Sequence, residues 1–270
     1  MWHNLAQLAR YRGLIQSLVA RELKARYRGS VLGFFWSFVN PLLLLLVYTF
    51  VFTYILPAKF KNPDGQSDMD YYALFLFCGL LPWTWFSSAL LEATGALITG
   101  GNLIKKVLFP AEVLPIVSVL ANMVHFFLGL IILVVFLLIY RHVPDLPGLV
   151  WFPIAVAVQL VFTLALALLL SALTVHFRDI RDLLSNLLTF WFFATPIVYP
   201  YFLESVARFR WLFNFNPFFH LATSYQEILY FPGPVGHAKW LLALGGASAA
   251  LFVFAYWIFD RLRDSFAEAV

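Results

Sequence analysis

Six long apolar stretches fill this 270-residue chain, and almost every charged residue lies between them. Four of them, residues 32–56, 114–140, 149–175 and 240–259, contain no Lys, Arg, Asp or Glu. A helix rises about 1.5 Å per residue, so about 20 residues cross a hydrocarbon core of about 30 Å. Because lipid offers the backbone no water, segments that span it are expected to be helices.

Two further stretches complete the set. Residues 71–98 carry a single acid, Glu92, and residues 183–199 are short for a span. The whole chain is 62% apolar and 12% charged, whereas about 25% of residues in a soluble domain are charged. A soluble protein would need six buried helices with almost no polar face. We therefore predict an all-α integral membrane protein with six transmembrane helices in one domain, residues 1–270.

The positions of the basic residues predict the orientation in the membrane. Six spans place both ends of the chain on one side. If that side is cytoplasmic, twelve of the 18 Lys and Arg residues fall in cytoplasmic segments and six in outer segments, as the positive-inside rule requires. The basic clusters are scattered around the spans rather than gathered on one folded face, so they indicate topology and not a nucleic-acid partner.

The first 29 residues have helical periodicity and do not resemble a cleavable signal peptide. Apolar residues such as Ile15 and Leu18 share one side of this helix, whereas Arg21, Lys24 and Arg28 share another. A basic amphipathic helix of this kind is suited to the cytoplasmic lipid interface.

Residues 200–238 form an aromatic-rich outer segment that prolines interrupt. The pair Asn216-Pro217 is a helix-start signal. We predict two short helices, at about 201–213 and 217–229, which dip into the outer leaflet and return before the last span. The alternative is an amphipathic outer loop that rests on lipid.

The sequence contains no pattern of covalent chemistry. It has no phosphate-binding loop of the nucleotide-hydrolysing type, no nucleophile motif, and no metal-ligand spacing among its six histidines. We therefore expect no catalytic residue, no metal and no cofactor in this chain, and we do not expect an enzyme. The lone Cys78, inside an apolar span, is interpreted as a small packing residue.

Ionisable residues inside the spans are the usual sites of proton or ion coupling. Only Glu92 and His125 qualify, and each lies toward the cytoplasmic end of its span. Glu92 can equally face water or a partner helix. A proton-coupled carrier is thus weakly supported, and a separate energy-supplying subunit is favoured.

Aromatic residues are abundant in the spans. Trp and Tyr near span ends are usually interface anchors, and lipid or core packing accounts for others. Flat aromatic faces also suit a sliding sugar polymer, and the candidates for this role are Phe34, Trp36, Phe190, Trp191 and Phe193.

Several motifs resemble one transporter family. Residues 21–41 read RELKARYRGSVLGFFWSFVNP, residues 105–115 read KKVLFPAEVLP, and residues 177–180 read FRDI. With Asn216-Pro217 and Tyr225, these motifs resemble the permease subunits of type-2 ABC exporters, in the branch that exports O-antigen, capsule and teichoic-acid polymers. One departure is Ala111, where the family pattern leads us to expect a basic residue.

The resemblance implies a homodimer in the cell inner (plasma) membrane, with two copies of a separate cytoplasmic ATPase that binds ATP and Mg. The substrate would be a lipid-linked glycan, carried outward. Spans one and five would line the channel at the dimer seam. The alternatives are an ABC exporter of drugs or lipids and, from another class, a membrane-embedded lipid-processing enzyme.

The resemblance also implies roles for particular residues. Residues 102–115 would be a coupling helix that contacts the ATPase through Asn102, Lys105, Lys106, Phe109, Pro110 and Glu112. A second cytoplasmic contact would involve Arg178, Asp179 and Arg181. The N-terminal helix would be a cytoplasmic gate that meets pyrophosphate or anionic headgroups through Arg21, Lys24, Arg26 and Arg28. Residues 201–229 would gate the outer end, with Asn216, Pro217 and Tyr225.

Overall fold

The computed structural model describes residues 10–55, 71–105, 109–231 and 233–269, and all regular structure in these ranges is helical. The elements are α2 (Arg12–Arg26), the 3₁₀ turn η1 (Gly33–Phe35), α3 (Trp36–Phe50), the π-helical η2 (Val51–Ile55), α4 (Tyr72–Thr99), α5 (Gly101–Ile104), α6 (Val113–Ile139), α7 (Leu146–Leu149), α8 (Phe152–His176), α9 (Ile180–Phe193), α10 (Glu204–Ala207), α11 (Arg210–Phe213), α12 (Pro217–Leu229) and α13 (Ala238–Ala269). The all-α prediction is confirmed.

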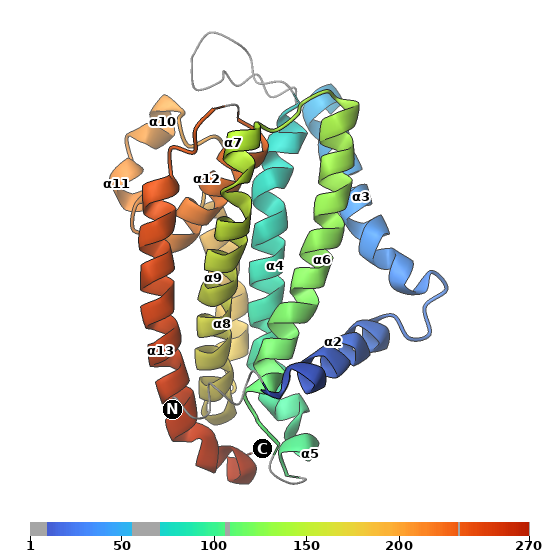
Figure 1. The fold of residues 1–270 in the computed structure, drawn as a ribbon, viewed down its shortest axis with the longest axis vertical. Helices are drawn as coiled ribbons and strands as arrows, with labels where there is room; N and C mark the ends of the chain where they lie inside the picture. The colour runs from blue at the N-terminus through green and yellow to red at the C-terminus, as the bar shows by residue number, and fades with distance from the viewer. Residues whose placement is uncertain (1–9, 56–70, 106–108, 232, 270) are drawn as a thin grey trace.

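The long helix α4 forms the centre of a bundle, with α6 and α8 packed against it (Figure 1). Helix α13 lies along α8, and α3 leans away from the bundle at its edge. Phe75, Phe77 and Phe86 of α4 are fully buried. Cys78 is buried beside them as a free thiol, which agrees with the packing role predicted for it.

Five described helical segments are long and apolar enough to cross a membrane: Gly33–Ile55, Tyr72–Thr99, Val113–Ile139, Leu146–His176 and Ala238–Phe266. They coincide closely with five of the predicted spans. The chain is therefore a multi-pass membrane protein.

The remaining predicted span, residues 183–199, is helical only as far as Phe193. Helix α9 has 14 residues, so its length is about 21 Å, less than the hydrocarbon core. Pro196 explains the end, because the residue before a proline disfavours the helical conformation. A complete sixth span stays a prediction.

The two ends of the bundle differ in character. At one end, here called the basal end, α2 packs against α6 and projects away from the bundle, and α5 and the last turns of α13 lie at the same end (Figure 1). At the other, the distal end, α7, α10, α11 and α12 gather. Helix α12 occupies the predicted residues 217–229. The predicted helix at 201–213 is instead two single turns, α10 and α11, because the Phe209 N–H bonds to Val206 O and closes the first turn.

Candidate functional site

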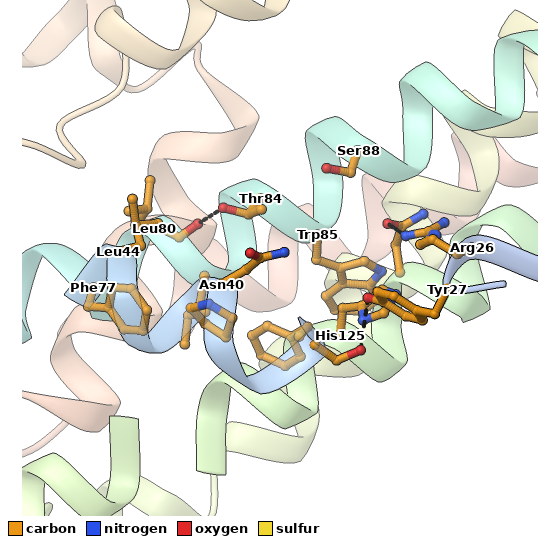
Figure 2. A pocket seen from close by; sticks show the side chains of 15 residues that line it. Arg26, Tyr27, Asn40, Leu44, Phe77, Leu80, Thr84, Trp85, Ser88 and His125 are labelled. Carbon is orange, nitrogen blue, oxygen red and sulfur yellow. Dashed lines mark hydrogen bonds between the residues drawn. The ribbon is translucent and has the colours of Figure 1, made fainter. Parts of the chain in front are cut away.

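Polar side chains from three neighbouring helices gather around one cavity. The cavity has a volume of about 510 Å³ and lies between α3, α4 and α6, next to the end of α2 (Figure 2). Its polar lining consists of Arg26, Tyr27, Ser37, Asn40, Thr84, Ser88, Asn122 and His125. Polar groups are costly inside a membrane and usually mark a functional path, so this cavity is the candidate site.

Some of the lining groups have partners and others do not. Ser37 Oγ donates a hydrogen bond to the Tyr27 hydroxyl over 2.8 Å, which ties the start of α3 to the end of α2. His125 Nε2 is buried and has no hydrogen-bond partner among the described residues. The carboxamide of Asn40 extends from α3 toward α4 (Figure 2). The cavity thus offers hydrogen-bonding groups that a polar ligand can use.

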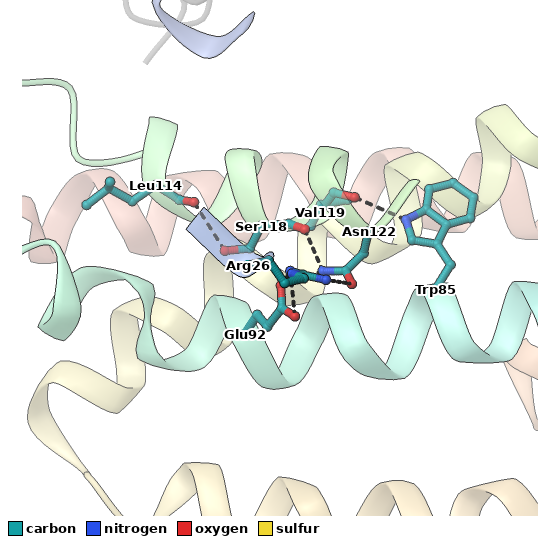
Figure 3. A network of polar contacts seen from close by, with 7 residues as sticks. All are labelled: Arg26, Trp85, Glu92, Leu114, Ser118, Val119 and Asn122. Carbon is teal, nitrogen blue, oxygen red and sulfur yellow. Dashed lines mark hydrogen bonds and ion pairs between the residues drawn. The ribbon is translucent and has the colours of Figure 1, made fainter. Parts of the chain in front are cut away.

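Three side chains join α2 to the bundle, and we call Arg26, Glu92 and Asn122 the latch (Figure 3). Arg26 Nη2 donates to both carboxylate oxygens of Glu92, over 2.8 and 2.7 Å. Asn122 Nδ2 donates to Glu92 Oε2 over 2.6 Å and to Ser118 O over 2.8 Å. The latch therefore connects α2 to α4 and α6 at the rim of the cavity.

The carboxylate in the latch bears on the proton-coupling hypothesis. Charge-assisted hydrogen bonds are the strong ones, and Glu92 accepts three of them. Glu92 therefore has the partner-helix role that the sequence left open beside proton coupling. Arg26, which we predicted to meet pyrophosphate or anionic headgroups, is paired with Glu92 in this structure.

The apolar side of α2 rests on α6. Leu18 is buried against Val113 and Val117, with Leu14 and Ile15 packed around them. The other predicted gate residues, Arg21, Lys24 and Arg28, are exposed. The helix is amphipathic, as predicted, and its apolar face packs on α6.

A second cavity, of about 330 Å³, lies on the basal side of the latch. Arg21 of α2, Asn102 of α5 and Arg181 of α9 all line it, together with Glu92. These residues belong to three sets that the sequence placed in separate roles. The structure brings one residue from each set to the lining of this cavity.

The predicted coupling helix, residues 102–115, is not one helix. Helix α5 ends at Ile104 and α6 begins at Val113. Lys105 is exposed, whereas Phe109 and Pro110 are half-buried. Lys106 lies outside the described residues. Pro115 is tolerated at the start of α6 because the first turn of a helix has no carbonyl partner for its N–H groups.

Glu112 corrects another prediction. We expected it to contact an ATPase, but it is 2% exposed and forms an ion pair with Arg263 of α13. A buried carboxylate needs a charged or hydrogen-bonding partner, and the partner in this chain supplies it. By contrast, Arg178, Asp179 and Arg181 lie exposed where α8 turns into α9.

The aromatic candidates separate into two groups. Phe34, Phe190 and Phe193 are exposed, so they remain candidates for a channel surface, and Trp36 is half-buried. Trp191 faces the interior: its Nε1 donates to Asn216 Oδ1 over 2.7 Å. Its ring also meets Phe86 edge-on, with 5.4 Å between centroids, so in this structure it is a packing residue rather than a channel one.

Asn216 connects α9 to α12 at the distal end. Its Oδ1 accepts from the backbone N–H groups of Phe218 and Phe219, and therefore caps α12, which begins at Pro217. Its Nδ2 donates to Thr195 Oγ1 over 2.8 Å and to Ala194 O over 3.2 Å, just after α9 ends. One side chain thus caps one helix and receives the end of another.

Tyr225, predicted as a gate residue, is fully buried. Its ring lies 6.0 Å from those of both Phe126 and Phe152. It therefore packs in the core and does not face an opening. The helix-start signal identified α12, but the sequence alone did not show which side of α12 is covered.

A distal polar cluster was not foreseen. Glu227 Oε1 lies 2.6 Å from His237 Nδ1 and accepts from the Tyr201 hydroxyl over 3.2 Å. Burial, and then the Glu227 carboxylate, raise the pKa of Tyr201 well above its usual value. Burial lowers the pKa of His220, which stacks on Trp240. The sequence signal for this cluster was an acid and two histidines within 20 residues, but nothing in their spacing paired them.

Together, the spans, the latch and the polar cavity define a polytopic helical membrane protein whose polar groups suit binding and passage. Residues 13–230 match the family model described as ABC-2 type transporter. The chain belongs to this family, whose members are membrane-spanning parts of transporters.

Three relatives extend the comparison. The chain is 42% identical to the O-antigen export system permease protein RfbA of Myxococcus xanthus, over 98% of each chain. It is 31% identical to a protein of the same name from Klebsiella pneumoniae, over 99% of this chain and 98% of the relative. It is 26% identical to the polysialic acid transport protein KpsM of Escherichia coli, over 79% and 80% of the two chains.

Proposed function

We propose that this chain is the membrane-spanning permease subunit of an ATP-driven exporter that carries a lipid-linked polysaccharide outward. The family match and the names of the relatives support this assignment. The observation that carries it in the molecule is the latch, because it holds a basic surface helix against a polar cavity at one end of the bundle.

The basal end faces the cytoplasm in this proposal, and the membrane is the cell inner (plasma) membrane. The exposed Arg21, Lys24 and Arg28 then lie at an anionic lipid surface, where each basic residue contributes about 1 kcal/mol of attraction. Both described ends of the chain lie on this side. The distal cap of α10, α11 and α12 faces outward.

The energy comes from a separate subunit. Two permease copies would assemble with two copies of a cytoplasmic ATPase, which binds ATP and Mg. The loop around α5, with Asn102 and Lys105, and the exposed turn at Arg178, Asp179 and Arg181 are the surfaces for that contact. This chain moves the substrate and performs no covalent chemistry.

The latch controls access to the cavity. The anionic end of a lipid-linked glycan competes with Glu92 for the Arg26 guanidinium. Once Arg26 is released, α2 shifts, and the hydroxyl and amide groups of Ser37, Asn40 and Thr84 become available to sugar hydroxyls. The exposed aromatic rings of Phe190 and Phe193 offer faces along which a polymer can slide.

The test is to remove the latch charge. We expect Arg26→Gln and Glu92→Gln to lower export of the host polysaccharide at least about tenfold. Each variant weakens the contact that holds α2 at the cavity, and hydrogen bonds to charged groups are each worth about 1.5–3 kcal/mol. Arg12→Gln is the matched control, since it makes the same change on the exposed surface of α2. Surface polymer per cell, normalised to permease and ATPase recovered together, is the measurement.

Three outcomes are informative. Loss of export in both latch variants, with the control unchanged, supports the proposal. Normal export in Glu92→Gln would show that the latch has no part in transport. Wild-type permease that purifies without an ATPase subunit, and without ATP hydrolysis, would refute the exporter assignment itself.

A further inference from the structure

We propose that the charged basal end of α13, residues 260–269, is a rigid arm that positions both ATPase-contacting segments. Glu112 and Arg263 are the positioning pair. This inference rests on the proposed function for its role in transport. The contacts that suggest it are independent of that function, because they all lie within the described chain.

The pair joins segments that are far apart in the sequence. Glu112 immediately precedes α6, where the loop from α5 ends, and Arg263 lies 151 residues later in α13. The Glu112 side chain is 2% exposed and that of Arg263 is 32% exposed. Breaking such a pair by removing one partner leaves an uncompensated buried charge, which is strongly unfavourable. The end of the loop is therefore held to α13 by an ion pair whose loss costs much free energy.

An apolar cluster surrounds the pair. Phe259 and Phe266 of α13 are buried together with Ala111, and Ile104 of α5 and Leu114 of α6 pack against them. The loop entry is equally close: a Cβ atom on Gly100 would lie 2.4 Å from a methyl carbon of Leu114 and 2.9 Å from Ala96 O. Gly100 before the loop and Leu114 after it are thus packed against each other, and a side chain at Gly100 would displace Leu114.

A second contact ties the other exposed turn to the same arm. Ser265 Oγ lies 3.1 Å from His176 Nε2, and His176 ends α8 just before Arg178, Asp179 and Arg181. Arg263 and Ser265, two residues apart in α13, therefore contact the end of the α5 loop and the turn after α8. These are the two segments that face the cytoplasm in the proposed function. A movement forced on either segment reaches the other through α13.

The length of α13 suits this role. It has 32 residues, whereas about 20 cross the membrane. The surplus forms the arm, and the rest of α13 packs along α8, which in turn packs on α4. A push at the α5 loop is therefore delivered to a helix that runs the full height of the bundle.

The experiment compares variants of the full permease–ATPase complex. Glu112→Gln and Arg263→Gln each break the pair. Glu112→Arg combined with Arg263→Glu reverses it. Arg261→Gln is the control, since Arg261 lies on the same helix, is exposed, and undergoes the same loss of charge. The measurement is polymer exported per ATP hydrolysed.

We expect the single variants to keep ATP hydrolysis and to lose about tenfold in export per ATP, the scale on which residues of one network couple. The reversed pair should recover most of that loss, and Arg261→Gln should match wild type. Export per ATP at the wild-type value in both single variants would overturn the proposal. So would a reversed pair that is no better than the single variants when all three accumulate normally.

Two additions keep the inference testable if a single variant fails to fold. Ser265→Ala removes the link to His176 together with the hydrogen bond that Ser265 Oγ donates to Leu262 O within α13. We expect it to lower export per ATP about twofold; an unchanged value would contradict the arm. A spin label on Lys105→Cys reports order in the α5 loop without the ATPase, because the native Cys78 is buried. Its mobility should rise when Arg263→Gln is added but not with Arg261→Gln. Unchanged mobility would refute the arm even if no ATPase co-purifies.

Discussion

Helices α3 and α4 look alike in the sequence but have opposite places in the molecule. Both belong to spans that are long and apolar enough to cross a membrane. In an apolar 18-residue window of each span, 78% is buried inside the chain for α4 and 6% for the segment that contains α3. The segment with α3 is the more apolar of the two. Apolarity therefore identifies a span but does not identify the centre of the bundle.

The reason is that lipid tails are as apolar as leucine, so burial against protein requires close packing rather than hydrophobicity. Helix α4 alternates small residues such as Gly79, Ala89 and Ala93 with large rings that interlock with other helices. Helix α3 presents a run of leucines on most sides. Its exposed residues suit contact with lipid, with a second copy of the chain or with a substrate.

The largest test of this comparison uses the same substitution in both helices. Phe86 of α4 is fully buried and stacks on Phe162 with 5.6 Å between centroids, whereas Phe50 of α3 is 57% exposed. We expect Phe86→Ala to cost about 3–5 kcal/mol of stability and Phe50→Ala less than about 0.5 kcal/mol. Thermal unfolding of the purified permease in detergent measures both. Equal losses would place α3 in the core as well.

A smaller effect is expected where α6 passes between the two helices. A Cβ on Gly129 would lie 2.6 Å from a methyl carbon of Leu81 in α4 but 3.6 Å from Pro41 in α3. Gly129→Ala should cost about 1–3 kcal/mol through overpacking against α4. Gly246→Ala in α13, with no atom within 4 Å of its Cβ, is the control and should be neutral or stabilising. A stable Gly129→Ala would mean that α6 and α4 pack loosely.

The smallest effect concerns α9, which resembles α3 in exposing large apolar residues such as Leu183 and Phe190. Asn216→Ala removes the cap of α12 and the contacts to the end of α9. We expect a loss of about 0.5–2 kcal/mol, with hydrogen exchange faster in α9 and α12 but unchanged in α4. Asn214→Ala, an exposed position two residues away, should have no effect. Faster exchange in α4 would show that α9 is part of the centre.

Sequence patterns identified local structure well. The predicted spans 71–98 and 114–140 agree with Tyr72–Thr99 and Val113–Ile139 within a residue, because a run of apolar residues between charges is a local signal. The helix at 217–229 was also predicted, since Asn216-Pro217 encodes its start chemically. In both cases the determining residues lie within the element itself.

The polar contacts were not predictable in the same way. Glu112 and Arg263 are separated by 151 residues, and Arg26 and Glu92 by 66. Each residue alone fits a charge at or near the end of a span, so the sequence did not pair them. Tyr225 and Trp191 are similar cases, because the side of a helix that is covered depends on its neighbours. In the two ion pairs and at these two aromatic residues, contacts between distant parts of the chain determine where the side chain lies.

The central claim is that this chain exports a polysaccharide with energy from ATP that a partner subunit hydrolyses. The location of the polymer in the cell tests this claim most directly. The measurement is the amount of surface polymer and of lipid-linked polymer inside the cell, in a host lacking this chain and after its return. We predict that loss of the chain leaves polymer lipid-linked on the cytoplasmic side, and that its return restores surface polymer only beside an active ATPase. Surface polymer that persists without the chain, or without ATP hydrolysis, would contradict the account.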